Sequence, residues 1–319
     1  MTVSSKSPLT RHSFLIFCLL PLLAADCTSQ QVAGVVNLTE LEPLNVESAT
    51  EVVPLRVAVA AVISPKGNVD SYGPLLDYLG DELNRPVELV QRRTYAEVNE
   101  LIKNGDVDLA FVCTSAYVAG AREFDMELLV APMVGGETVY YSLLIVPADS
   151  SASSIADLRD SIFAFTDPMS NTGRNYPTRL VLEMGQTPDN YFKRTFFTYS
   201  HDDAIRAVAN GVADGAAIDS LVYDFTVGRE PELAQKTKVI HRSPPFGIPP
   251  VVVGPHVRPQ SKAELRAILL AMNESQDGLR ALATAGIVRF VTIDDSAYET
   301  VRELEAQITS QSAETIGAP

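Results

Sequence analysis

The sequence predicts an α/β protein of two lobes, each a mainly parallel sheet flanked by helices, with a ligand cleft between the lobes. Short apolar runs alternate with amphipathic stretches along the chain, which is the pattern of βαβ units. The alternation occurs in two sets, and the chain passes between them near 142–145 and near 246–251. A length of 319 residues, 46% of them hydrophobic, suits about two domains.

The first set begins at residue 55. Its expected strands are short apolar runs of the length of buried strands, at 55–60, 86–90 and 108–112. Its expected helices carry apolar residues at helical spacing, at 72–83 and 95–103. These elements alternate as strand and helix, so they predict the first parallel sheet.

The second set follows an apolar strand at 139–146. Its further strands are expected at 162–165, 195–197 and 215–218, with a return strand at 251–253. Its helices are expected at 171–184 and 201–210, and two later helices at 261–273 and 298–307 complete the fold. Lobe 1 is therefore predicted to comprise 55–142 with 248–307, lobe 2 to comprise 143–247, and 308–319 to form a C-terminal tail.

The segment 1–26 is predicted to be a signal peptide. Lys6 and Arg11 precede an apolar run at 14–25, which is too short to span a bilayer as a helix. Residues 27–54 are polar and without a clear period, so they are predicted to form a flexible tether.

Cys27 follows the apolar run, at the place of a lipoprotein cysteine. Asp26 directly before it departs from the usual lipobox, which ends in small residues. Two alternatives stay open: lipidation of Cys27, or ordinary cleavage after Ala25. Membrane attachment is expected only through this lipid.

Composition excludes several functions. The formal charge of −15 offers no electrostatic footprint for nucleic acid, although local donors still allow an anionic ligand because distant charges are screened. Gly-rich phosphate loops and G-x-S-x-G elbows are missing, so no cofactor and no enzymatic activity are expected. The sequence has no zinc spacing, since its only histidines are His12, His201, His241 and His256. A hydrolase using His201 with Ser170 is the alternative, but no third group is evident to orient the histidine.

The most informative stretch follows the strand at 162–165. Asp167-Pro168 sets a turn, and Ser170, Asn171, Thr172 and Gly173 then open a helix. Free backbone N–H groups and hydroxyls at a helix start form an anion site. The alternative is an ordinary N-cap with polar turn residues.

The pattern Asp-Pro-x-Ser-x-Thr-Gly, followed by a proline, resembles the phosphate/phosphite/phosphonate-binding family of ABC-transporter periplasmic proteins. The resemblance runs from about Leu55 to Glu305 and implies the type II periplasmic binding protein fold. Four further segments match the family in order: Asp108-Leu109-Ala110-Phe111 with Ala116-Tyr117, the strand 140–146, the histidine-led helix start 200–205, and the segment 211–220.

The resemblance implies a set of ligand contacts. Ser170, Thr172 and the amides of the turn, including those of Asn171 and Gly173, would hold an oxyanion. His201 would donate a hydrogen bond as a protonated or correctly tautomerised ring. Tyr140 would reach the anion from the other lobe, and Asp219 would suit a ligand that keeps a P–OH proton. The alternatives are a solvent-facing His201, a core-packed Tyr140 and a turn role for Asp219.

Two departures from the family bear on the ligand. The turn at 246–250 lacks the acid that neutralises the ammonium of an aminophosphonate, which favours a smaller ligand without an amine. Cys113 begins the loop that contains Thr114 and Tyr117, where many relatives carry glycine. Cys113 is either a small buried packing residue or a ligating thiolate, as in arsenite-binding sensors of the same fold.

The resemblance therefore implies an exported periplasmic solute-binding protein. It would capture phosphite, phosphonate or phosphate by hinge closure and pass it to an ABC-transporter permease. The alternative is a periplasmic arsenite sensor that uses Cys113 and signals to a histidine kinase.

Overall fold

A computed structural model of the chain describes residues 52–317. The predicted signal peptide at 1–26, Cys27, and nearly all of the predicted tether lie outside the described residues. Regular structure begins with a strand at Leu55, as predicted.

The first sheet has six strands in the order β13-β4-β12-β3-β1-β2. Strands β1, β2 and β3 pair in parallel, whereas β12, β4 and β13 pair antiparallel. The strands are β1 (Leu55–Val59), β2 (Val87–Val90), β3 (Leu109–Phe111), β4 (Glu127–Met133), β12 (Val251–Val253) and β13 (Arg289–Val291). Its helices are α1 (Pro65–Leu83), α2 (Tyr95–Asn104), α3 (Thr114–Phe124), α9 (Pro259–Ala271), η3 (Met272–Glu274) and α10 (Gln276–Thr284).

The second sheet has five strands in the order β10-β6-β9-β7-β8. Strands β7, β8 and β9 pair in parallel, and β6 and β10 pair antiparallel. The strands are β6 (Ser142–Pro147), β7 (Ile162–Phe165), β8 (Arg194–Phe197), β9 (Gly215–Asp219) and β10 (Thr237–Arg242). Its helices are η1 (Ile155–Leu158), η2 (Asn171–Asn175), α4 (Tyr176–Leu182), α5 (Pro188–Tyr191), α6 (His201–Ala209), α7 (Ser220–Arg229) and α8 (Pro231–Lys236).

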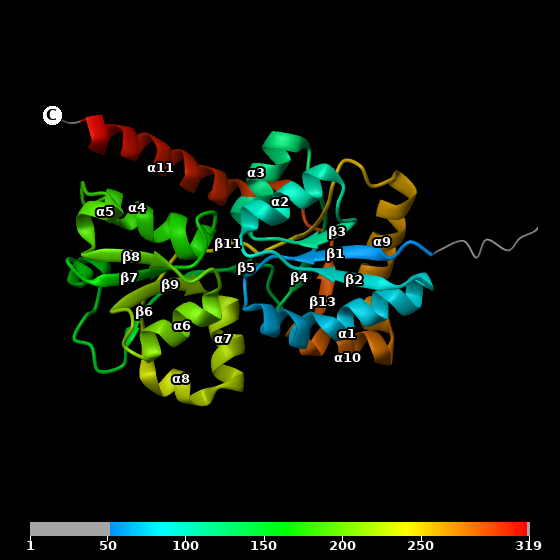
Figure 1. The fold of residues 1–319 in the computed structure, drawn as a ribbon, viewed down its shortest axis with the longest axis horizontal. Helices are drawn as coiled ribbons and strands as arrows, with labels where there is room; N and C mark the ends of the chain where they lie inside the picture. The colour runs from blue at the N-terminus through cyan, green and yellow to red at the C-terminus, as the bar shows by residue number, and fades with distance from the viewer. Residues whose placement is uncertain (1–51, 318–319) are drawn as a thin grey trace, which may run out of the picture. The chain divides into compact units, whose positions relative to one another are not determined.

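Helices cover both faces of each sheet (Figure 1). We call the first sheet with its helices lobe 1 and the second lobe 2. The sheets are mixed, so the expected parallel pairing holds for three strands of each, while the strands next to the crossings run antiparallel. The crossings themselves pair as a two-stranded ribbon of β5 (Val139–Tyr140) and β11 (Phe246–Gly247). The predicted strand 139–146 is thus divided at Tyr141 between this ribbon and β6.

The last helix corrects one prediction. The short turn η4 (Asp295–Tyr298) leads into α11 (Glu299–Gly317), so 308–317, predicted as a tail, are helical. The helix continues because no Gly or Pro interrupts it before Gly317 and because Ile308 extends the apolar stripe of Val301 and Leu304. In Figure 1, α11 passes from α3 of lobe 1 to α4 of lobe 2, and it packs against both.

Candidate functional site

The predicted anion turn has an irregular but well-defined start. Ser170 is the N-cap, and its hydroxyl accepts a hydrogen bond from the Gly173 amide at 3.0 Å. A π-helical turn, η2, precedes the regular helix α4. Pro177 cannot donate to the Gly173 carbonyl, which instead accepts from the Thr166 amide at 3.4 Å. Because the α-helix proper begins only at Tyr176, the first amides and the side chains of the turn matter more here than the helix dipole.

Gly173 allows this turn to press against the end of β7. A Cβ atom on residue 173 would lie 1.9 Å from Thr166 Oγ1 and 2.8 Å from Thr166 Cβ. Thr166 is fully buried, so its backbone and side chain have little room to move. The absence of a side chain at residue 173 therefore fixes where the amides of the turn lie.

A tyrosine at the crossing joins the two lobes. The Tyr140 hydroxyl lies 2.6 Å from Thr114 Oγ1 of lobe 1 and accepts from Asn171 Nδ2 of lobe 2 at 3.1 Å. All three side chains are buried. Burial, with the nearby Cys113 and Asp219, raises the pKa of Tyr140 well above its ordinary value, so the hydroxyl stays protonated.

His201 is fixed as a neutral hydrogen-bond donor. The Asp219 amide donates to its Nδ1 at 2.9 Å, so the ring proton resides on Nε2, which lies 3.4 Å from Ser170 Oγ. Burial lowers the pKa of His201 to about 3, although Asp202 acts in the opposite direction. Of the expected alternatives, the structure favours the tautomerised neutral ring, and His201 does not face solvent.

Asp219 ends β9 and caps α7. Its carboxylate accepts from the amides of Leu221 and Val222 at 2.7 and 3.4 Å. Burial raises its pKa to about 7, despite these hydrogen bonds. Asp219 thus serves the turn and also faces the space between the lobes, where it lines a pocket. Near neutral pH its carboxyl group is partly protonated and able to donate.

Several buried polar side chains near Tyr140, His201 and Asp219 have no hydrogen-bond partner within residues 52–317. In the described part of the chain, Thr172 Oγ1 and Tyr95 OH are buried and have no hydrogen-bond partner, and neither has the Asn171 side-chain oxygen. Buried polar atoms without partners are rare and costly, so these three are candidates for contact with a ligand. We call Tyr95, Thr114, Tyr140, Ser170, Asn171, Thr172, His201 and Asp219 the polar cluster.

Tyr95 was not predicted from the sequence as a site residue. It is the first residue of α2, and Thr94 before it forms a capping box with Glu97. The Asp108–Phe111 segment and the turn at 170–173 could be predicted as parts of the site because they match family motifs. The signal that indicates Tyr95 is weaker: a tyrosine directly after an N-cap, beyond the carboxyl end of a strand.

Cys113 was predicted to be either a packing residue or a ligating thiolate. Cys113 lies beside the cluster, where the amides of Asn171 and Ser115 favour its thiolate, but burial dominates and raises its pKa to about 11. The thiol is therefore neutral, which argues against thiolate ligation.

Tyr117, which was also predicted as a ligand contact, does not belong to the polar cluster. Its hydroxyl donates to Asp295 at 2.6 Å and its ring packs edge-on against Tyr298, because one helical turn carries it toward α11.

Lobe-to-lobe hydrogen bonds enclose the polar cluster. The Tyr95 amide donates to Asp167 of lobe 2 at 3.1 Å, and Asn175 donates to Ser115 at 3.2 Å. The Ser64 amide and hydroxyl of lobe 1 donate to Asp202 at 2.8 and 2.7 Å. Asp167 and Asp202 thus each lie at the start of a lobe 1 helix and complete its capping. These hydrogen bonds join the two lobes around the polar cluster.

Within residues 52–317, His, Cys, Asp and Glu side chains form no group of three or more that could hold a metal ion. Among the helices of this same range, not one has the length and apolar character that crossing a bilayer requires.

Two α/β lobes joined by a double crossing, with a buried polar cluster between them, define the two-lobed class of solute-binding proteins. The family model described as "ABC transporter, phosphonate, periplasmic substrate-binding protein" matches residues 57–298. The chain belongs to this family, which confirms the resemblance and the fold predicted from the sequence. The family is one of binding components, in agreement with the expected capture without chemistry.

Similar proteins carry related descriptions. The phosphate-import protein PhnD of Mycolicibacterium smegmatis is 34% identical over 163 residues, which are 48% of this chain and 51% of that protein, so the match spans about half of this relative. A binding protein component of an ABC phosphonate transporter from Pseudomonas aeruginosa superposes with a TM-score of 0.78 at 23% identity, covering 82% of this chain and 89% of that one. PhnD1 of Prochlorococcus marinus, solved with methylphosphonate, gives 0.72 at 17% identity, covering 80% and 98%. The two structures establish similarity of fold.

We predict that Gly173→Ala destabilises the protein by about 1–3 kcal/mol, because the new Cβ atom overlaps the buried Thr166. Urea denaturation measures the free energy of unfolding. Gly228→Ala is the matched control: no atom lies within 4 Å of its added Cβ, and alanine in helix α7 is neutral or stabilising. Equal stability of the two variants would contradict the packing argument.

Proposed function

We propose that this protein captures a small tetrahedral oxyanion, namely phosphite, a phosphonate or phosphate, in the polar cluster. It would hold the ligand by closure of the two lobes and deliver it to an ABC-transporter permease. The observation that carries the proposal is that Thr172 Oγ1 and Tyr95 OH, two hydroxyls of the polar cluster, are buried and have no partner among the described residues. The His201 Nε2–H, beside Ser170 Oγ, is a further donor of the same cluster. The membership of the family and its description as periplasmic support the place and the partner.

The chemistry of the donors favours an oxyanion. Thr172 belongs to lobe 2 and Tyr95 to lobe 1, so an anion between them would accept hydrogen bonds from both lobes. Neutral hydroxyl and imidazole donors suit an anion that is fully enclosed, since hydrogen bonds to charged groups are stronger than those between neutral groups. The neutral thiol of Cys113 argues against the arsenite alternative, and the relatives named above give it no support.

The kind of ligand, the partner and the lipidation of Cys27 are further parts of the proposal. The turn at 246–250 contains no acid, which favours a ligand without an ammonium group. A histidine-kinase partner and lipidation at Cys27 remain alternatives to a permease partner and a free protein. Radiolabelled palmitate incorporation into the full chain, compared with Cys27→Ala, decides between lipidation and ordinary cleavage.

Closure would depend on the contact between Ser64 and Asp202. Burial by itself raises the pKa of Asp202, but hydrogen bonds from Ser64, Arg206 and Ser200 outweigh it and hold the pKa below its ordinary value. Asp202 is therefore charged at neutral pH and lies at the first turn of α1. Opening of the lobes would break these hydrogen bonds, so they add to the stability of the closed form.

The first test is calorimetry of phosphite, methylphosphonate and phosphate against the wild type and Thr172→Ala. We expect tight binding of at least one ligand, and a loss of about 10- to 100-fold in the variant, since a hydrogen bond to a charged group is lost. Thr309→Ala, an exposed threonine of α11, is the control and should bind as the wild type does. Absence of binding for all three ligands would reject the proposal.

Affinity should also depend on pH through Asp219. Its pKa of about 7 means that the carboxyl is neutral below that pH and charged above it. A charged Asp219 repels the oxyanion, so affinity should fall by up to about tenfold per pH unit above neutrality. Calorimetry at about pH 6 and pH 8 measures this loss. Asp219→Asn keeps the ligand's own ionisation but loses the protein's, so an equally steep profile in this variant would contradict the assignment.

Closure is tested with Asp202→Asn. The variant keeps the size of the side chain but removes the charge at the start of α1, so we expect affinity to fall by about 5- to 30-fold. Small-angle scattering without ligand should show a larger radius of gyration than the wild type. Asp203→Asn is the matched control, because Asp203 pairs with the same Arg206 and its hydrogen bonds, to Arg206 and Ser200, are within lobe 2. Equal effects of the two variants would contradict a role in closure.

A further inference from the structure

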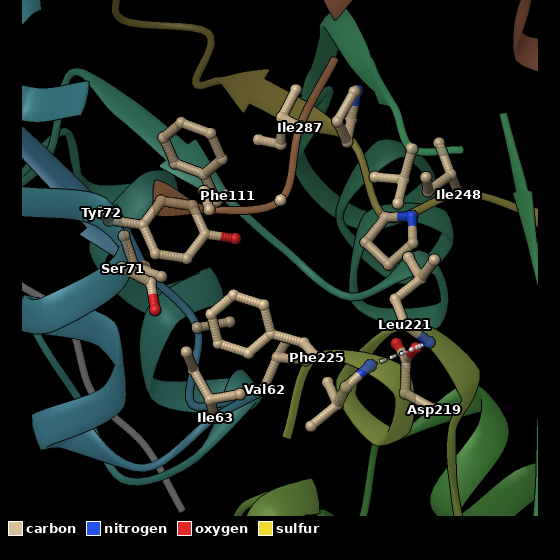
Figure 2. Close-up of a pocket in the computed structure, with 18 of the residues that line it drawn as sticks. Val62, Ile63, Ser71, Tyr72, Phe111, Asp219, Leu221, Phe225, Ile248 and Ile287 are labelled. Carbon is tan, nitrogen blue, oxygen red and sulfur yellow. Dashed lines mark hydrogen bonds between the residues drawn. The ribbon is translucent and has the colours of Figure 1, made fainter. Parts of the chain in front are cut away.

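A pocket of about 240 Å³ lies beside the polar cluster, between the two lobes. Figure 2 shows that most of the side chains around it are apolar. Phe111 and Ile287 line it from lobe 1, and Leu221 and Phe225 from α7 of lobe 2. Ile248, in the segment that returns to lobe 1, lines a further side.

The pocket adjoins the polar cluster through Asp219. This residue lines the pocket, and its own amide donates to His201 in the cluster. Burial, and then the Asp219 charge, raises the pKa of Tyr72, a pocket residue, to about 12. The same charge acts on Tyr95 and Tyr140 of the cluster. Val112 also lines the pocket directly before Cys113.

The pocket is suited to an uncharged group. Its carboxylates are Asp219 and Asp224. Asp219 is engaged by the amides of Leu221 and Val222, and its pKa of about 7 leaves it partly protonated at neutral pH. Asp224 is exposed at the edge, and Arg242 opposes its charge. Asp219 is buried but already accepts two hydrogen bonds, and Asp224 is exposed, so neither carboxylate is both buried and without partners.

Size indicates what the pocket holds. An apolar cavity of about 150 Å³ accommodates benzene, so about 240 Å³ has room for a phenyl ring or a short alkyl chain. The hydroxyl of Tyr72 points into this space (Figure 2), and Ser71 adds a second hydroxyl to the lining, which is buried and has no hydrogen-bond partner among the described residues. These two hydroxyls, with Asp219 and Asp224, are the polar groups among otherwise apolar walls.

We propose that this pocket takes the organic substituent of the ligand, and that the protein prefers phosphonates with an uncharged alkyl or aryl group over those with an amine. The inference rests on the proposed function, since the oxyanion must occupy the polar cluster for its substituent to reach the pocket. It narrows the ligand beyond a small oxyanion to an organophosphonate with an apolar chain.

The test compares methylphosphonate, propylphosphonate, phenylphosphonate and 2-aminoethylphosphonate by calorimetry. Propylphosphonate and 2-aminoethylphosphonate have nearly the same shape and differ in a methyl against an ammonium group. Each buried methylene contributes about fourfold in affinity, so propylphosphonate should bind about 15-fold more tightly than methylphosphonate. It should also bind more tightly than 2-aminoethylphosphonate, and phenylphosphonate should bind at least as well as methylphosphonate.

Two variants locate the preference in the pocket. Phe225→Ala removes part of the apolar wall and should reduce the advantage of propylphosphonate while leaving methylphosphonate unchanged. Leu221→Glu places a carboxylate in the wall and should shift the ratio of the two isosteric ligands toward 2-aminoethylphosphonate by at least tenfold. Residue 221 lies in the first turn of α7, where an acidic side chain is compatible with the helix.

The outcomes separate this inference from the proposed function. If methylphosphonate binds, but propylphosphonate binds no better or 2-aminoethylphosphonate binds better than propylphosphonate, the apolar assignment is overturned and oxyanion capture stands. If none of the four ligands, nor phosphite or phosphate, binds, both are overturned. Unchanged ratios in both variants would place the substituent outside this pocket.

Discussion

A group of neutral hydrogen-bond donors, held away from water between two lobes, is the constraint on which the rest of the structure depends. The donors come from helix starts of both lobes: Tyr95 and Thr114 from lobe 1, Thr172 and His201 from lobe 2. Hydrogen bonds with the backbone position two of them: a capping box precedes Tyr95, and the Asp219 amide fixes the tautomer of His201. Burying unpaired donors costs free energy, and the hydrogen bonds between the lobes offset part of this cost.

The sequence allowed much of this to be predicted, because short-range signals determined it. Apolar runs located β1 and β7, and the Ser170–Gly173 segment located the start of the helix that follows β7. Family motifs added His201 and Asp219. What they could not specify was protonation: the neutral ring of His201 and the raised pKa of Asp219 arise from burial by segments distant in the sequence.

Other features were missed because they depend on tertiary packing. The π-helical turn results from Pro177 together with the close contact of Gly173 and Thr166, and a regular helix was the simpler expectation. The sequence analysis predicted that the last helix ends at residue 307, whereas α11 continues to Gly317. Ser and Thr residues in this segment made the apolar stripe that reaches Ile308 hard to recognise. Tyr117 matched a motif yet contacts Asp295, since the motif specified its position in the chain and not its side-chain direction.

The cation-free character of the polar cluster has a consequence for how the protein responds to salt. Among the described residues, the side-chain hydrogen bonds of Tyr140, Asn171 and His201 involve no Lys or Arg. Retention of an anion in the proposed site would then depend on the direction of fixed dipoles, which dissolved ions screen little in a buried site. Encounter differs, because a chain of charge −15 repels anions at long range and salt weakens that repulsion. Rising ionic strength should therefore speed capture while leaving release nearly unchanged.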